Sequence, residues 1–254
     1  CYLTGASMTT LKRLKTLGYV ELSEREVLRT AIKTPDKILS PPELSPEQQA
    51  AYDGLSSQMR EEKPGVALLY GVTGSGKTAV YIRLIDRVLE EGKGALLLVP
   101  EIALTPQLLT KLTSHFGKQV AVLHSSLRVG ERYDEWRRIR SGAARVVVGT
   151  RSAVFAPLQN LGLILVDEEQ EHTYKSENAP RYHAREVAIY RGVQEQALVV
   201  LGSATPSIES MFFARAGVYK LYTMKTRYNG RALPRVEIVD MKQELRSGNP
   251  ASLS

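Results

Sequence analysis

The chain has 254 residues, of which 43% are hydrophobic and 24% are charged, a composition typical of a globular protein with a buried core. It has one cysteine, Cys1, which excludes an internal disulfide framework and a cysteine-based zinc site within one chain. Its net charge of +7 suits a polyanion such as nucleic acid, and equally suits solubility alone. No apolar run approaches the roughly 18 residues of a membrane span, and no signal peptide is visible. The chain begins with Cys rather than Met, and we expect it to be a piece of a longer protein.

The first residues predict a short basic module. Ser7 is a suitable N-cap for a helix over residues 8–17, Gly18 would end that helix, and residues 19–22 alternate like a short strand. Residues 1–40 carry seven Lys and Arg and four acids, a net charge of 7 − 4 = +3. We interpret residues 1–33 as part of a winged-helix segment. The alternative is a solvated helix that caps the next domain.

Prolines mark a linker over residues 34–44, and a new helix begins directly after it. Ser45 is a good N-cap, Pro46 stands at the first helical position, and Gln48 follows at the spacing of a capping box. These three residues predict the start of the main domain.

A glycine-rich turn follows an apolar strand and precedes an amphipathic helix. Residues 66–70 are apolar, residues 79–91 have helical periodicity, and residues 71–78 read Gly-Val-Thr-Gly-Ser-Gly-Lys-Thr, which fits the phosphate-binding loop G-x-x-x-x-G-K-[ST]. Glycines let successive N–H groups point at phosphate oxygens, and the helix N-terminus adds partial positive charge. We expect Lys77 to reach the β- and γ-phosphates and the Thr78 hydroxyl to hold Mg²⁺. The predicted nucleotide contacts in this turn are Gly71, Thr73, Gly74, Ser75, Gly76, Lys77 and Thr78.

The remaining chain alternates apolar runs with helical stretches. The expected strands are residues 95–99, 120–123, 145–148, 163–166 and 198–201, and the expected helices are residues 105–116, 130–140 and 184–194. Near-continuous Val, Leu and Ile strands separated by helices predict an α/β fold with a mostly parallel sheet covered by helices on both faces. Ligands in such folds bind at the carboxyl ends of the strands. The unusual polar residues of this chain do follow strands, at 100–101, 124–125, 149–152, 167–170 and 202–205.

Two acids end the strand at residues 163–166. We expect Asp167 to bind Mg²⁺, through water, and Glu168 to orient and deprotonate the attacking water. Acids at a strand end are common on protein surfaces, so the phosphate loop is what favours a catalytic role for them. Lys77, Asp167 and Glu168 are therefore the predicted catalytic residues, with Thr78 and Asp167 at the metal.

Longer strings resemble the PriA family (primosomal protein N′) of bacterial replication-restart helicases, in helicase superfamily 2. The strings are residues 71–78, Val-Pro-Glu-Ile-Ala-Leu-Thr-Pro at 99–106, Gly-Thr-Arg-Ser-Ala-Val-Phe-Ala-Pro at 149–157, Asp-Glu-Glu at 167–169 followed by Tyr174-Lys175, Arg-Tyr-His-Ala-Arg at 181–185, and Ser-Ala-Thr at 203–205. The resemblance covers about residues 7–254.

The resemblance implies an ATP-dependent 3′–5′ DNA helicase that hydrolyses ATP with Mg²⁺ and acts in primosome assembly and restart of stalled forks. It makes residues 45–232 a RecA-like P-loop NTPase lobe, the first of two, with residues 233–254 leading toward the second lobe, which is absent along with the family's zinc module. Implied partners are single-stranded and forked DNA, other primosome and helicase-loading proteins and single-stranded DNA-binding protein. The implied location is the bacterial cytoplasm, at the nucleoid, with no membrane partner.

The resemblance also implies residue roles. In many helicases a glutamine at the place of Gln48 reads the adenine edge with its amide; the alternative is a capping role only. Residues 170–182 correspond to an aromatic-rich loop that couples single-stranded DNA to ATP hydrolysis, and ordinary packing is the alternative for Tyr174 and Tyr182. The implied DNA-contacting or coupling residues are Thr105, Thr150, Arg151, Ser152, Gln170, Tyr174, Lys175, Arg181, Tyr182, Ser203 and Thr205.

Two departures from the family stand in that loop. Position 170 is Gln where the family usually has His, and Pro180 stands where a tryptophan can occur. The second lobe of such a helicase supplies an arginine finger worth about 10³–10⁵ in rate in related NTPases. We therefore expect this chain alone to bind nucleotide weakly and to hydrolyse it slowly.

Two other functions compete with a motor. One is a nucleotide-gated module that binds fork DNA and loads a helicase, in which unwinding is incidental. The other is an unrelated phosphate-loop enzyme, a kinase or GTPase, which predicts an acceptor pocket or a guanine-specifying Asn-Lys-x-Asp string. The sequence contains no such string.

Overall fold

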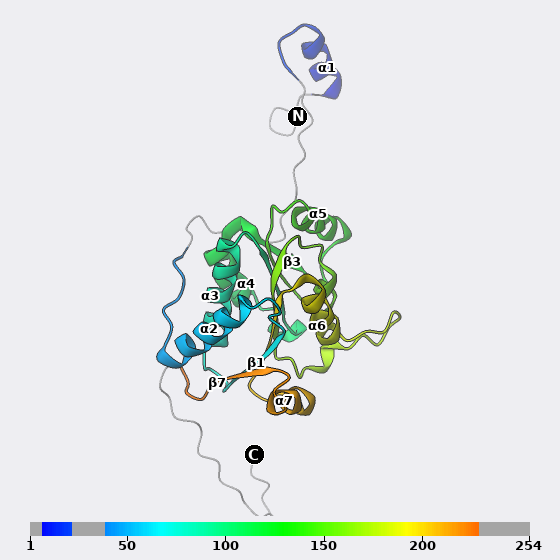
Figure 1. Ribbon diagram of the computed structural model, residues 1–254. Helices are drawn as coiled ribbons and strands as arrows, with labels where there is room; N and C mark the ends of the chain where they lie inside the picture. Colours follow the sequence, from blue (N-terminus) through cyan, green and yellow to red (C-terminus); the bar gives the residue numbers. More distant parts are fainter. Residues whose placement is uncertain (1–6, 22–38, 229–254) are drawn as a thin grey trace, which may run out of the picture.

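A parallel β-sheet forms the centre of the molecule (Figure 1). The computed structural model describes residues 7–21 and 39–228, and seven strands lie within those ranges in the order β3-β4-β2-β5-β6-β1-β7. Every neighbouring pair is parallel, which confirms the predicted fold class. The strands are β1 (Val66–Gly71), β2 (Gly94–Leu98), β3 (Val120–Leu123), β4 (Val146–Gly149), β5 (Leu161–Asp167), β6 (Leu198–Ser203) and β7 (Lys220–Met224).

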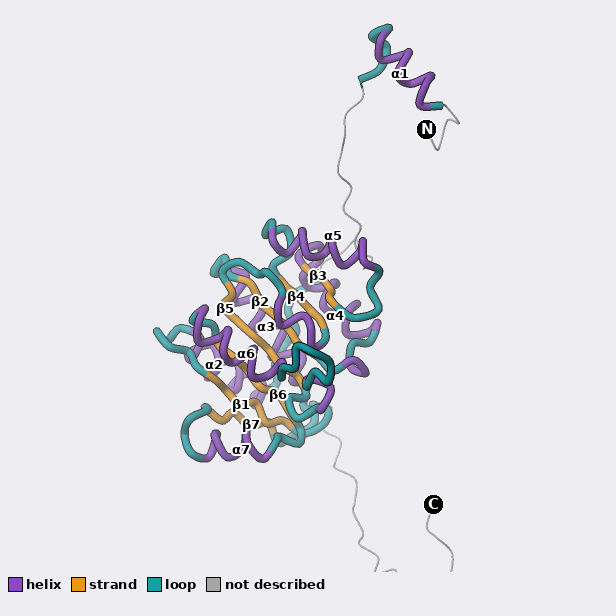
Figure 2. Tube along the Cα trace, turned by 90° about the vertical axis from the view of Figure 1, so that its right-hand side faces the viewer, coloured by secondary structure: helices purple, strands orange, loops and turns teal. Residues whose placement is uncertain are grey.

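Helices cover both faces of this sheet (Figures 1 and 2). One face packs against α2, α3 and α4, through side chains such as Leu55, Val80 and Leu112. The other face packs against α5, α6 and α7, through side chains such as Ile139 and Ala188. The helices are α1 (Met8–Thr16), α2 (Pro46–Met59), α3 (Lys77–Glu90), α4 (Pro106–Phe116), α5 (Val129–Arg140), α6 (Ala184–Glu195) and α7 (Ile208–Arg215).

Strands β1 to β6 are apolar along most of their length because helices cover both faces of the sheet. All five residues of β2 are buried, and its side chains alternate between the two cores: Leu96 joins the α5–α7 side and Leu97 the α2–α4 side. A strand buried on both faces needs apolar side chains at every position, so its sequence shows a continuous apolar run.

The chain termini differ from the expectations in part. Ser7 caps α1 as expected, but none of the residues of α1 is buried, and residues 19–21 form no strand. Leu22, residues 34–38 of the expected linker and residues 233–254 lie outside the described residues, so the winged-helix segment and the domain boundaries stay predictions. Among the residues that the structure describes, no helix has the length and apolar character that crossing a bilayer requires.

Two elements near the end of the lobe were not expected from the sequence. They are α7 and the edge strand β7, which pairs with β1 from Ala67 to Gly71. Within β7 only Met224 is buried, so the strand lacks the apolar run that marks the others. Its pairing brings the end of the described chain beside the glycine turn, where Val72 N–H donates to Met224 O at 3.1 Å.

We expect Gly202→Ala to destabilise the fold, because a Cβ at this position in β6 would overlap the Tyr81 hydroxyl and lie 3.0 Å from Tyr81 Cζ. Tyr81 is buried, so the ring has little room to move, and overpacking of this kind costs about 1–3 kcal/mol. Tyr81→Phe removes the clashing hydroxyl, so the same glycine substitution should cost less in that background. Urea unfolding of the four proteins of this cycle measures both costs; equal costs in the two backgrounds would contradict this packing.

Candidate functional site

The glycine turn joins β1 to α3 at the carboxyl edge of the sheet. Gly74 and Gly76 have φ values of 80° and 83°, which glycine adopts without strain. No side chain caps the N-terminus of α3, so the first N–H groups of this helix keep their capacity to bind an anion. The Ser75 hydroxyl is buried and has no hydrogen-bond partner within the described residues. The turn thus has the cradle form that a phosphate group requires.

The two acids lie at the same edge as the turn. Strand β6 separates β5 from β1, and all three are parallel, so Asp167 and Glu168 emerge beside the loop. Lys77 Nζ lies 3.4 Å from Glu168 Oε1 and donates to Gly71 O at 3.2 Å. The structure therefore brings the glycine turn and the acid pair together, as the strand pattern led us to expect.

The Asp167 carboxyl is largely withdrawn from water. Burial raises the pKa of its carboxyl, while the hydroxyl of Tyr81, which donates to Asp167 Oδ1 at 2.9 Å, and the nearby Lys77 ammonium lower it. Glu168 has φ 46°, a left-handed conformation that is uncommon outside glycine and is often found at functional sites. A carboxylate that is costly to ionise gains most from a cation beside it.

The donor set suits a magnesium ion held jointly with phosphate. A Thr78 hydroxyl and an Asp167 carboxylate are oxygen ligands of the kind that Mg²⁺ prefers, and Mg²⁺ usually binds one or two carboxylates together with substrate phosphates. Within the described part of the chain, no cluster of three or more His, Cys, Asp or Glu could hold a metal by itself. The residues present therefore fit a metal that arrives with a nucleotide.

Gln48 connects the start of α2 to the phosphate loop. Its side chain is 1% exposed; Oε1 accepts from Ser45 N at 2.9 Å and Nε2 donates to Ser75 O at 2.8 Å. The capping box is thus formed, and the amide nitrogen of the Gln48 side chain holds the loop through the Ser75 carbonyl. An adenine contact by Gln48 would have to share these groups, and it stays a prediction.

A cavity of about 350 Å³ opens beside the loop, a size typical of small-ligand sites. Its lining comes from the linker, α2, the loop, α3, α4 and the end of the described chain, namely Pro42, Glu43, Gln48, Gly74, Gly76, Thr78, Ala79, Lys111 and Tyr228. Tyr228 N–H donates to Gly74 O at 2.9 Å, which fixes this end of the chain against the turn. Sequence reasoning missed Glu43, Lys111 and Tyr228, because no motif marks them.

Gln170 links the acid pair to the Ser-Ala-Thr segment. Its Nε2 donates to Glu168 Oε2 at 3.0 Å, and its Oε1 accepts from the Ser203 hydroxyl at 2.6 Å. Ser203 Oγ in turn accepts from Thr205 N at 2.9 Å. An amide donates and accepts at once, so glutamine makes a continuous chain of hydrogen bonds at the place where the family usually has histidine.

Glu169 forms a second link that sequence reasoning did not single out. Its buried carboxylate accepts from Arg185 Nη1 at 2.8 Å, from Ser207 N at 2.7 Å and from the hydroxyls of Ser207 and Ser210 at 3.1 and 3.0 Å. The acid loop after β5, the start of α6 and the start of α7 are joined at this one side chain.

Comparison with known proteins identifies the lobe. The family model of the DEAD/DEAH box helicases matches residues 45–212, which is more than half of the chain. The chain belongs to the DEAD/DEAH box helicase family. The replication restart protein PriA of Bacillus subtilis is 48% identical over the whole chain, and PriA of Synechocystis is 44% identical over 98% of it. The chain spans about a third of these two relatives, 32% and 30% of their lengths, and the expected resemblance to PriA is confirmed.

Two solved structures agree with the fold. A structure of RecG bound to a three-way DNA junction is 26% identical, with a TM-score of 0.56 over 82% of this chain and 27% of that one. The helicase domain of Pyrococcus furiosus Hef, at 21% identity and a TM-score of 0.50, covers 72% of this chain and 38% of that one and shows the fold alone.

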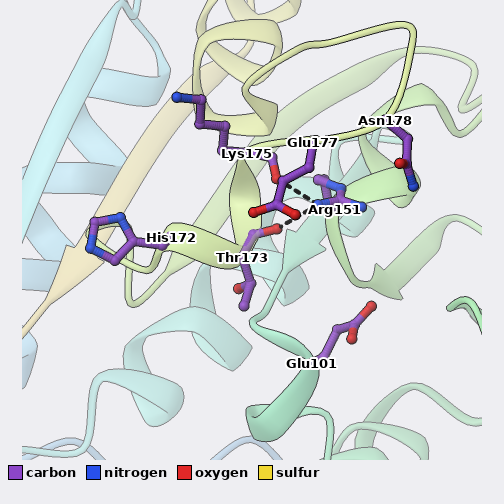
Figure 3. Close-up of a pocket in the computed structure, with 7 residues that line it drawn as sticks. All are labelled: Glu101, Arg151, His172, Thr173, Lys175, Glu177 and Asn178. Carbon is purple, nitrogen blue, oxygen red and sulfur yellow. Dashed lines mark hydrogen bonds between the residues drawn. The ribbon is translucent and has the colours of Figure 1, made fainter.

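The segments that follow β4 and β5 carry residues for which we expected contacts with DNA. Arg151 Nη1 donates to Thr173 O at 3.2 Å and to Lys175 O at 2.6 Å, so the segment after β4 holds the loop after β5 (Figure 3). Beside this contact lies a cavity of about 330 Å³ lined by Glu101, Arg151, His172, Thr173, Lys175, Glu177 and Asn178 (Figure 3). Strand-end segments that are distant in sequence thus form one concave surface.

The expected DNA residues differ in their accessibility. Ser152, Lys175, Arg181 and Thr205 are exposed, and Arg151 and Gln170 are partly exposed. Thr150 and Ser203 are buried, and the Thr105 side chain is used as the N-cap of α4.

The structure corrects the expectation for Tyr174. This side chain is 0% exposed, and its hydroxyl donates to Asp167 O at 2.6 Å, so its ring packs under the acid loop and offers no face to a base. Tyr182 is partly exposed and packs edge-to-face on Phe155 with ring centroids 4.9 Å apart. The packing alternative therefore holds for Tyr174, and Phe155 is a neighbouring ring that sequence reasoning left aside.

We expect Glu169→Ala to lower the free energy of unfolding by about 3–5 kcal/mol, because the substitution leaves a partly buried guanidinium and three other donors without their acceptor. Glu186→Ala removes an exposed partner of the same Arg185 side chain and should cost less than about 1 kcal/mol. Urea unfolding of both variants measures the difference. Similar unfolding midpoints for the two variants would contradict the proposal that the Glu169 carboxylate holds these segments together.

Proposed function

We propose that this chain is the ATP-binding lobe of a DNA helicase that acts in replication restart. The single observation that carries the proposal is the 3.4 Å approach of Lys77 to Glu168, which joins the glycine turn to the acid pair at one sheet edge. Similarity to PriA over the whole chain supports the replication-restart role. The finer proposals are translocation on single-stranded DNA in the 3′–5′ direction and hydrolysis of ATP with Mg²⁺.

Each residue at the edge has a distinct task in this proposal. The N–H groups of the turn and Lys77 would hold the phosphates, and Thr78 and Asp167 would hold a metal ion, which would neutralise phosphate charge. Glu168 accepts a proton from the water that attacks the γ-phosphorus, as the bond to the leaving ADP oxygen breaks and inorganic phosphate forms. Lys77 pairs with Glu168 at 3.4 Å. Phosphates bound by Lys77 would therefore compete with the Glu168 carboxylate for the same ammonium group.

The hydrogen-bond chain through Gln170 supports a coupling role. It connects the general base to Ser203 and Thr205, and Arg151 connects the neighbouring loop to the segment after β4. A change in the DNA-side segments thus has a contiguous path to Glu168. The proposed partners are single-stranded and forked DNA, together with primosome and helicase-loading proteins and single-stranded DNA-binding protein.

A fork-binding and helicase-loading module is the second candidate. The exposed cations Lys175 and Arg181 favour DNA binding under either candidate, so they do not discriminate. Both candidates predict that Lys77→Ala in the full-length protein abolishes unwinding. Only the second predicts that fork binding and helicase loading survive nearly intact in this variant. Gel-shift and helicase-loading assays, run beside an unwinding assay, distinguish the two candidates.

We expect Lys77→Ala to weaken the binding of a fluorescent ATP analogue with Mg²⁺ at least tenfold, about 1.4 kcal/mol or more, because it removes a cation from the phosphate cradle. Lys93→Ala, which changes a partly exposed lysine between α3 and β2, is the matched control and should leave the affinity unchanged. Equal affinities for both variants would overturn the nucleotide site.

We expect Gln170→Ala in the full-length protein to reduce DNA-stimulated ATP hydrolysis more than basal hydrolysis, because the link from Glu168 to Ser203 is lost. Gln170→His, which restores the residue usual in the family, should retain most of the stimulation. Steady-state turnover with and without single-stranded DNA measures both effects, and an equal loss in the two conditions would argue against coupling through Gln170.

We expect the chain by itself to hydrolyse ATP slowly, since an arginine finger from a second lobe contributes about 10³–10⁵ in rate. A steady-state assay beside full-length Bacillus subtilis PriA tests this. Comparable turnover by the two proteins would show that the lobe needs no second one.

A further inference from the structure

The structure changes which aromatic rings are accessible for stacking. Tyr174 is fully buried, whereas Trp136 on α5 is 39% exposed and Phe155, at the end of the 3₁₀ turn η3 (Arg151–Phe155), is 56% exposed. Both rings line a cavity of about 140 Å³, together with Leu123, His124, Arg132, Ser152 and Ala156. A cavity of about 150 Å³ holds benzene, so the volume suits one ring-sized group.

One wall of this cavity is a stripe along α5. Arg132, Trp136 and Arg140 are four residues apart, so they lie on one side of the helix. The Arg140 guanidinium carbon is 5.6 Å from the Trp136 ring centroid, and Arg132 Nη2 donates to Ser125 O at 3.1 Å. The indole is therefore flanked by a cation on each side along the helix.

The opposite wall is the 3₁₀ turn after β4. Phe155 is held by Tyr182, whose ring meets it edge-to-face at an interplanar angle of 70°. Ser152, on the same turn, is exposed and lines the cavity. Because a neighbour already fixes the Phe155 ring, stacking on it costs little additional side-chain entropy.

The charges around the cavity favour a polyanion. Residues 128–140 contain five arginines and three acids, a net charge of 5 − 3 = +2. Among the acids, Glu135 is buried against Arg138 at 2.8 Å, and Glu131 accepts from the N–H of Arg128 at 3.0 Å. Arg132 and Arg140 are exposed beside Trp136, whereas the acids Glu131 and Asp134 are only partly exposed. Exposed arginines beside an aromatic ring are the combination that binds single-stranded nucleic acid.

We propose that this cavity takes one base of single-stranded DNA, stacked against Trp136 and Phe155, with backbone phosphates beside Arg132 and Arg140. The inference rests on the proposed DNA binding by this lobe and adds a base site outside the loop at residues 170–182. A nucleobase accounts for both the ring-sized cavity and the arginines. An apolar side chain of a protein partner accounts for the cavity alone.

Trp136 is the single tryptophan of the chain, so its fluorescence reports this cavity directly. The full chain is titrated with a short oligothymidylate and with the same backbone carrying abasic residues, while the anisotropy of a label on the DNA follows total binding. We expect the oligothymidylate to quench Trp136 and to bind about tenfold more tightly than the abasic strand.

Phe155→Ala should weaken oligothymidylate binding about tenfold and leave abasic binding unchanged. Phe212→Ala, which removes a ring that is 66% exposed on α7, is the matched control and should change neither. Phe155→Leu keeps apolar volume without a π face and should behave like Phe155→Ala. Urea unfolding of each variant verifies that the fold persists.

Three outcomes would overturn the base site alone while leaving DNA binding in place: equal affinity for the two strands, unchanged Trp136 fluorescence on saturation, or a Phe155→Ala effect no larger than that of Phe212→Ala. If anisotropy detects no binding of either strand, DNA binding by this lobe and the base site both fail. The nucleotide site is judged separately, by the binding of the ATP analogue.

Discussion

Parallel strands all end at the same edge of a sheet, and the rest of this structure depends on that constraint. The strand order places β5, β6 and β1 side by side, so the acid pair, the Ser-Ala-Thr segment and the glycine turn emerge together. Burial on both faces makes the sheet rigid, and it excludes water from the base of the edge. The cost of this arrangement is visible at Asp167, where burial raises the pKa of the carboxyl.

Hydrogen bonds turn this shared edge into a connected unit. Glu168, Gln170 and Ser203 form one chain, and Glu169 joins Arg185 and Ser207 in another. Both chains run between the loop after β5 and the loop after β6, so neither loop can move without disturbing the other. Arg151 extends the connection to the segment after β4. In the proposed motor, these contacts couple DNA binding to ATP hydrolysis.

The sequence was sufficient for six of the seven strands in the described residues, and for the meeting of the glycine turn with the acid pair, because their signals are local. Continuous apolar runs mark strands buried on both faces, and the glycine turn has one residue order that fits a phosphate. The remaining features depend on tertiary contacts. Tyr174 sits in an aromatic loop, yet its burial under Asp167 follows from the fold of that loop. The edge strand β7 lacks an apolar run, and the carboxylate of Glu169 finds its donors on helices that begin far along the chain. The rings of Trp136 and Phe155 come together only because α5 and the turn after β4 pack side by side.

The central claim is that Thr78, on the loop side, and Asp167, on the acid side, serve one magnesium–nucleotide site. Equilibrium binding of an ATP analogue, with and without Mg²⁺, to the wild-type chain, Thr78→Val, Asp167→Asn and the double variant tests this claim most directly. The account predicts that either substitution removes most of the affinity gained with Mg²⁺ and that the double variant loses little more. Full retention of the Mg²⁺-dependent gain in Asp167→Asn, or independent and additive losses, would contradict it.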